Sequence, residues 1–109
     1  MSYEYRLIFT DVSSARHVMD VLRASAACIR GQGQEICLKD SELKSSAEYD
    51  ACLMQEDEKS LWLKVNFRSP CLYRLLQDAL EGRPVRCFED GDIDDEVTLK
   101  EAFRIKGEN

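Results

Sequence analysis

Residues that interrupt regular structure are scarce in this sequence. Its 109 residues include two prolines and five glycines, too few for a fibrous or disordered chain. No apolar run approaches the roughly 20 residues that cross a bilayer, so the sequence predicts no contact with a membrane. Because Glu4 and Arg6 interrupt the first apolar residues, we also expect no secretory signal peptide.

Motifs for cofactor binding are also lacking. The sequence has no Cys-x-x-Cys pair, which a zinc knuckle would need, and no glycine-rich loop with the lysine of a phosphate site. The cysteines are odd in number, widely spaced and placed within predicted helices or strands, where a thiol acts as a small apolar group. We therefore expect no metal or cofactor and five free thiols in a reducing cytoplasm, at Cys28, Cys37, Cys52, Cys71 and Cys87.

The surplus of acidic over basic residues is confined to one short stretch. The chain has 21 acidic and 15 basic residues, a formal net charge of −6. Residues 89–96 hold six carboxylates and no base, and without them 15 acids face 15 bases. An acidic chain is a poor nucleic-acid binder, because phosphate contacts need clustered Lys and Arg. The balance favours a basic protein partner over a nucleic acid.

Alternating apolar residues predict six strands. The alternation is clearest where Leu61, Leu63 and Val65 face one way. The acidic connector at residues 56–59 suits a hairpin loop. The last strand has an alternative that stays open, because Lys100 and the three residues after it also tolerate a helix. The predicted strands cover residues 3–10, 35–39, 48–55, 61–67, 85–88 and 97–105, and residues 40–46 form a polar loop.

Two amphipathic helices complete the predicted architecture. The first is capped by Asp11, Ser13 or Ser14 and carries an apolar stripe through Ala26 to Ile29. The second begins at Ser69 and Pro70. The order β-α-β-β-β-α-β-β predicts a single α+β domain over residues 1–109. It would have a largely antiparallel sheet with both helices on one face, in a ferredoxin-like or related split β-α-β arrangement.

The acidic stretch partly matches a calcium-binding loop. Asp90, Asp92 and Asp94 take the first, third and fifth positions of an EF-hand-like loop, and Glu101 takes the twelfth. Against this match, Asp95 stands at the sixth position, where the sharp turn needs glycine. The residues before the loop also predict a strand instead of an entering helix. A calcium-binding or regulatory module using residues 89–101 is therefore the alternative function.

Two other interpretations of the acidic stretch stay open. Crowded carboxylates repel one another, and a basic partner would relieve that repulsion and be steered in by it. A solvated hairpin loop that only maintains solubility has the same composition. If the helices cover the face of Leu61 and Leu63, Trp62 stands on the opposite, open face, where an exposed aromatic would anchor a partner. The alternative, which stays open, is that Trp62 only packs against Cys52 or Met54 of a neighbouring strand. An apolar open face predicts a partner or a second protomer.

A catalytic centre has the weakest support. His17 is the one histidine, one position off the apolar stripe of the first helix, and no motif places a nucleophile beside it. Glu48 and Asp50 would face the same side of a strand, as an acid–base pair or as solvent-facing residues. We therefore predict a protein that is not an enzyme.

A short acidic domain with one carboxylate cluster and no catalytic motif resembles, in its general character, the small immunity proteins of bacterial polymorphic toxin systems, of the contact-dependent or type VI secretion kind. The resemblance implies a cytoplasmic protein that binds and occludes a cognate toxin domain, such as a nuclease or an ADP-ribosyltransferase, without doing chemistry. The residues predicted to contact the partner are Asp90, Asp92, Asp94, Asp95, Glu96, Glu56, Asp57, Glu58 and Trp62.

Overall fold

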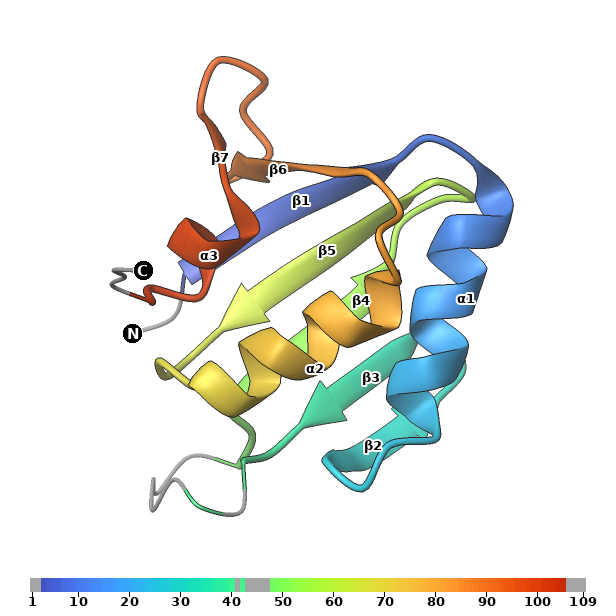
Figure 1. The fold of residues 1–109 in the computed structure, drawn as a ribbon, viewed down its shortest axis with the longest axis vertical. Coiled ribbons are helices and arrows are strands. Elements are labelled where there is room, and N and C mark those ends of the chain that lie inside the picture. The colour runs from blue at the N-terminus through green and yellow to red at the C-terminus, as the bar shows by residue number, and fades with distance from the viewer. Residues whose placement is uncertain (1–2, 41, 43–47, 106–109) are drawn as a thin grey trace.

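One antiparallel sheet organises the molecule. The computed structural model describes residues 3–40, 42 and 48–105. Its strands lie in the order β2-β3-β4-β5-β1-β6-β7 (Figure 1), and every adjacent pair is antiparallel. The strands are β1 (Tyr3–Phe9), β2 (Cys28–Gln32), β3 (Glu35–Leu38), β4 (Ala51–Gln55), β5 (Ser60–Val65), β6 (Val85–Glu89) and β7 (Glu96–Val97).

Three helices accompany the sheet, namely α1 (Val12–Arg23), α2 (Pro70–Leu80) and α3 (Leu99–Ala102). The predicted caps are confirmed. The Asp11 carboxylate accepts from the backbone N–H of Ser14 at 2.7 Å, and the Ser69 hydroxyl accepts from that of Leu72 at 3.0 Å. Helices α1 and α2 contact each other and lie over one face of the sheet (Figure 1). No helix in the described part of the chain is long and apolar enough to cross a membrane.

The core fills the space between the helices and that face. Alternate residues of the central strands are buried there, and Leu53, Leu61 and Leu63 each expose 0% of their surface. The helices contribute Val18, Leu22 and other apolar residues to the same cluster. Burying one such side chain contributes about 1.5–3 kcal/mol, so the core fixes which face of the sheet the helices cover.

The connection between β5 and β6 forms a split β-α-β unit. Both strands pair with β1 and run antiparallel to it, so they are parallel to each other with β1 between them and α2 as the crossover. The prediction of an α+β fold with an antiparallel sheet is confirmed. The specific ferredoxin-like order is not confirmed by this strand order.

Most predicted strands agree with the structure. Those at residues 3–10, 35–39, 61–67 and 85–88 are confirmed as β1, β3, β5 and β6, with ends shifted by one or two residues. The acidic connector joins β4 to β5 as a hairpin loop, as predicted. The polar loop predicted at residues 40–46 lies almost entirely outside the described residues.

The prediction of a first helix that continues through Ala26 to Ile29 is wrong. The chain turns instead, and the Ser25 hydroxyl donates to the Leu22 carbonyl oxygen at 2.8 Å, satisfying an acceptor at the end of α1. Residues Cys28–Gln32 then form strand β2, which pairs with β3. Gly33 adopts φ +61° and forms the turn of that hairpin instead of a helix C-cap. Apolar spacing alone could not distinguish the two outcomes.

The prediction of a final strand over residues 97–105 is also wrong, and the helical alternative is the one observed. The Thr98 hydroxyl accepts from the Glu101 N–H at 3.1 Å, and the Glu101 carboxylate accepts from the Thr98 N–H at 2.8 Å. This capping box starts a helix. Phe103 is then buried in the core with 1% exposure, and Arg104 at φ +60° follows the helix end.

The strand predicted at residues 48–55 begins later, at Ala51. Asp50 precedes it and is completely buried, accepting a hydrogen bond from the Asp40 N–H at 2.9 Å. Glu48 is exposed. The two carboxylates therefore do not share a strand face as an acid–base pair, because the backbone before β4 is not extended strand.

Candidate functional site

The candidate site is the sheet face that no described helix covers, called here the open face. Strand residues of the parity opposite to the core project from it. Because the strands are in register, these side chains form rows across the sheet. One row consists of Arg30, Cys37, Cys52, Lys64 and Glu4, and the next of Glu35, Met54, Trp62, Arg6, Phe88 and Glu96.

Trp62 lies on this face, as predicted, and its strand β5 is the middle one of the sheet. Its indole Nε1 donates to Glu4 Oε1 at 2.7 Å, and the Arg6 guanidinium stands 5.5 Å from the ring centroid. Its register partner Met54 is 48% exposed. Beside them lies a shallow hollow of ≈100 Å³ to which Cys52 also contributes. The open face thus combines an apolar strip, formed by the half-buried Trp62 and the exposed Met54, with charged neighbours. The alternation in the sequence predicts that these two residues share a face.

The loop at residues 90–95, called here the acidic loop, is fixed against Trp62. Gly91 has φ +75°, and a Cβ atom there would lie 3.1 Å from the Trp62 ring and 3.4 Å from the Arg6 guanidinium carbon. Only glycine allows this approach without displacing the ring. The Asp90 N–H also donates to the Glu4 carbonyl oxygen at 2.8 Å. A segment distant in sequence is thereby anchored at the edge of the apolar strip.

All four aspartates of this loop are exposed. Within the described residues, none of Asp90, Asp92, Asp94 and Asp95 forms an ion pair. The Asp92 carboxylate accepts from the Asp94 N–H at 2.9 Å, which shapes the turn. Glu96 differs, because it pairs with Arg86 at 2.8 Å, and this hydrogen bond lowers its pKa. The Glu96 carboxylate is therefore already paired with an arginine of the same chain.

Two of the three acidic residues predicted at positions 56–58 also form hydrogen bonds within the chain. Glu56 receives two hydrogen bonds from Arg6, at 2.8 and 3.3 Å. The Asp57 carboxylate accepts from the Lys59 N–H, which lowers its pKa. Glu58 is exposed. Arg6 therefore connects the two acidic segments: its guanidinium binds Glu56 and lies next to Gly91 of the acidic loop. Local sequence patterns do not indicate this role.

The carboxylates of the calcium-like match do not converge. The Glu101 carboxylate is engaged in the cap of α3, and its pKa is lowered by the hydrogen bond from the Thr98 N–H. The strand β6 enters the loop, as expected. Among the described residues, the single group of three side chains whose ligand atoms lie within 4.8 Å of one another is Glu35, Cys37 and Cys52.

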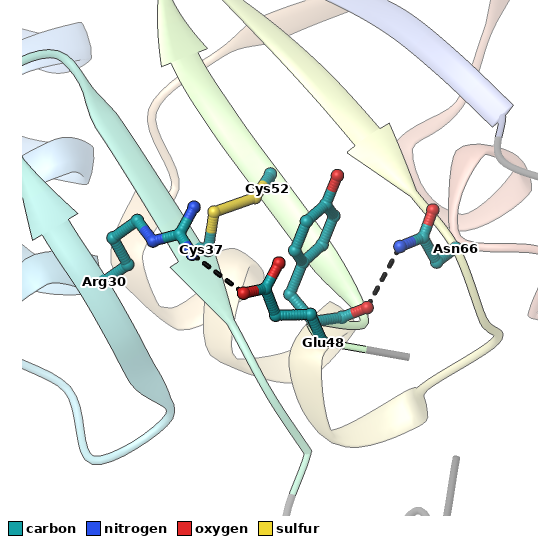
Figure 2. The surroundings of a disulfide bond; sticks show 6 residues. Arg30, Cys37, Glu48, Cys52 and Asn66 are labelled. Carbon is teal, nitrogen blue, oxygen red and sulfur yellow. Dashed lines mark hydrogen bonds and ion pairs between the residues drawn. A yellow bond between two sulfur atoms is a disulfide. The ribbon is translucent and has the colours of Figure 1, made fainter. Parts of the chain in front are cut away.

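The prediction of five free thiols is wrong for two of them. Cys37 and Cys52 are register partners on β3 and β4 and form a disulfide, with 4.2 Å between their Cα atoms (Figure 2). Their direct opposition depends on the register between β3 and β4, which local sequence patterns do not show. Cys28, Cys71 and Cys87 are free. Burial, followed by nearby carboxylates, raises the pKa of the Cys87 thiol to about 12.

His17 lies on the surface of α1, as expected. Its Nε2 is 2.9 Å from Glu81 Oε2. It borders an open hollow of ≈430 Å³ with Ser13, Arg16 and Arg83. No cysteine lines this hollow among the described residues, so the structure brings no Cys-His pair together there.

In comparisons with known proteins, no family model, curated protein or solved structure matches the chain.

Proposed function

We propose that this chain is a cytoplasmic, non-catalytic binding domain that docks a basic protein on its open face, and that it acts as an immunity protein by occluding a toxin domain. The single observation that carries the proposal is the fixed position of the acidic loop beside the apolar strip at Trp62. Interfaces combine a desolvated aromatic anchor with a polar rim in this way.

The charges around the strip support a basic partner. On the open face, Arg6 and Arg86 are neutralised by Glu56 and Glu96. Lys64 lies on the same face between Glu4 and the disulfide. The largest group of unpaired charges beside the strip is therefore the exposed aspartates of the acidic loop, with Glu58 nearby. A partner rich in Lys and Arg would meet this negative rim, which raises the association rate at low salt.

Occlusion requires no chemistry from this chain. The aspartates would approach the cationic groups of the partner's cleft, while Trp62 and Met54 exclude water from the contact. Because Gly91 and Trp62 hold the loop in place, little loop entropy is lost on binding, which favours affinity. The calcium-binding alternative predicts heat when the protein is titrated with millimolar calcium, whereas occlusion predicts none.

The test uses the toxin domain encoded beside this gene, measured for binding and for inhibition. We expect Asp92→Lys with Asp94→Lys to weaken binding at least about tenfold and to reduce its salt dependence. The matched control reverses two exposed acids on the helical side, Asp20→Lys and Asp78→Lys, and should leave affinity unchanged. Equal effects of both pairs, or the lack of an adjacent toxin gene, would overturn the immunity role.

A second variant tests the apolar strip separately. Met54→Glu introduces a charge beside Trp62 and should abolish binding while leaving the fold intact, because Met54 is 48% exposed. A second copy of this chain is the other occupant that an exposed apolar strip allows. Sedimentation of the wild type and of Met54→Glu distinguishes the two, since only self-association changes the mass of the isolated protein.

A further inference from the structure

The Cys37–Cys52 disulfide lies on the open face, outside the hydrophobic core cluster. The backbone N–H of Gln55 donates to the Gln34 carbonyl oxygen at 2.9 Å, which marks a hydrogen-bonded pair of β3 and β4. Because such pairs alternate along antiparallel strands, Cys37 and Cys52 occupy a non-hydrogen-bonded position. The ladder bonds on either side hold the two strands together independently of the disulfide.

The two sulfur-bearing residues differ in access. Cys52 lines the hollow of ≈100 Å³ beside Trp62, and Cys37 does not. Their exposed fractions are 6% and 1%, respectively. A small molecule in the hollow therefore meets Cys52 first, which makes its sulfur the electrophile and Cys37 the leaving group.

Several charged residues of the open face lie next to the pair. Arg30 is the register partner of Cys37 (Figure 2), and Lys64 is that of Cys52. Both cations favour thiolates. The Glu35 carboxylate lies within 4.8 Å of the sulfurs and has the opposite effect. Glu48 binds Arg30 at 3.0 Å and partly offsets its charge, so Lys64 is the cation beside the accessible sulfur.

We propose that Cys37 and Cys52 form a reversible thiol–disulfide exchange site that reacts with small thiols and dithiols through Cys52. A disulfide in a reducing cytoplasm is usually of this transient kind. The proposal shares the cytoplasmic compartment with the proposed function, but it does not depend on the docking role, because the reaction requires only that the hollow admit a small molecule.

A dithiol reduces the pair in two steps. Its thiolate attacks Cys52 Sγ, a mixed disulfide forms, and the bond to Cys37 breaks, leaving the electron pair on Cys37 as a thiolate that takes a proton from water. The second thiolate of the dithiol then attacks its own sulfur in the mixed disulfide. Cys52 leaves as a thiolate, and the dithiol is oxidised to a cyclic disulfide. A disulfide oxidant reverses both steps.

The first test is the reduction of the folded wild-type protein by dithiothreitol, followed by alkylation and mass spectrometry. We expect the rate to rise in proportion to the dithiothreitol concentration, since the reagent attacks the native state. A rate independent of concentration would mean that unfolding must come first and would overturn the proposal. So would the lack of a Cys37–Cys52 bond in the air-oxidised protein.

Variants that keep one cysteine of the pair then test which sulfur reacts, in a background of Cys28→Ser, Cys71→Ser and Cys87→Ala. Cys37→Ser leaves Cys52, which should form a mixed disulfide with glutathione disulfide at least about tenfold faster than Cys37 does in Cys52→Ser. Near-ultraviolet circular dichroism checks that both variants are folded. Equal rates in folded variants would overturn the assignment of Cys52.

Charge variants test the environment without removing a sulfur. Lys64→Gln should slow reduction of the wild-type disulfide about three- to tenfold, and Glu35→Gln should accelerate it by a similar factor. Lys59→Gln, an exposed lysine in the β4–β5 loop, is the matched control and should have no effect. Changes of the same sign in Lys64→Gln and Glu35→Gln would point to a structural disturbance and contradict the proposal.

Discussion

Replacing Phe103 by alanine tests the revised C-terminal structure most directly. The ring is 1% exposed, belongs to the core cluster and lies 6.0 Å from the Tyr73 ring. Helix α3 has four residues, and a helix that short has almost no stability of its own. Its position therefore depends on the Phe103 side chain. Deleting a buried phenylalanine ring costs about 3–5 kcal/mol, a large share of the roughly 5–15 kcal/mol that keeps such a domain folded.

The assay is urea denaturation followed by Trp62 fluorescence. Phe103→Ala should lower the free energy of unfolding by about 3–5 kcal/mol, and Phe103→Leu, which keeps most of the volume, by about 1–1.5 kcal/mol. Gln77→Ala, on the exposed side of α2, is the control and should change little. A loss below about 1 kcal/mol in Phe103→Ala would refute the buried helix and would fit an exposed edge strand.

Three further predictions follow from buried or capped groups. Asp50→Ala leaves the Asp40 N–H without its buried acceptor and should cost about 3 kcal/mol in urea denaturation, whereas an unchanged midpoint would contradict this role. Iodoacetamide at about pH 8 should label the exposed Cys71 before Cys87, because burial raises the pKa of Cys87 to about 12. Peptide mass spectrometry measures the order of labelling, and the opposite order would contradict this prediction. The pKa of Glu101 is lowered in the fold, so the stability that its carboxylate contributes is present at neutral pH and is lost as the pH falls through its folded-state pKa. Glu101→Gln should therefore make the melting temperature fall less steeply at acidic pH. An unchanged acidic part of the profile would contradict the role of Glu101 in the cap.

Local patterns predicted much of the fold. Alternation predicted β1, β3, β5 and β6, and serine with proline marked the start of α2, since these signals depend on neighbours in sequence. The wrong predictions concern segments whose apolar residues fit both the helical period of 3.6 residues and the strand period of two. Ile29 continues a helical stripe and also suits a strand edge, and its pairing with β3 decided between them. At Thr98 and Glu101 a capping box was present in the sequence, but the apolar alternation around it dominated the prediction.

The candidate site depends more on long-range contacts. The parity of Trp62 correctly placed it on the face opposite the core. No local signal could reveal that Glu4 would accept its indole N–H, that Gly91 would contact its ring, or that Cys37 would face Cys52. Each of these contacts requires the register between strands. Sequence reasoning thus identified the residue types of the open face but missed the contacts that organise them.

The arrangement of charge gives the strongest reason to regard the acidic loop as more than a solubility device. A loop that only attracts water needs no fixed position, and repulsion among its carboxylates is then relieved by motion. Here the Asp90 N–H is bound to β1 and Gly91 lies against Trp62, so the chain holds Asp92 and its acidic neighbours together despite their repulsion. Glu56 and Glu96, in contrast, are neutralised by arginines. An anchored group of unpaired aspartates beside an exposed apolar strip is the arrangement that a basic partner would complement, which favours docking over solvation alone.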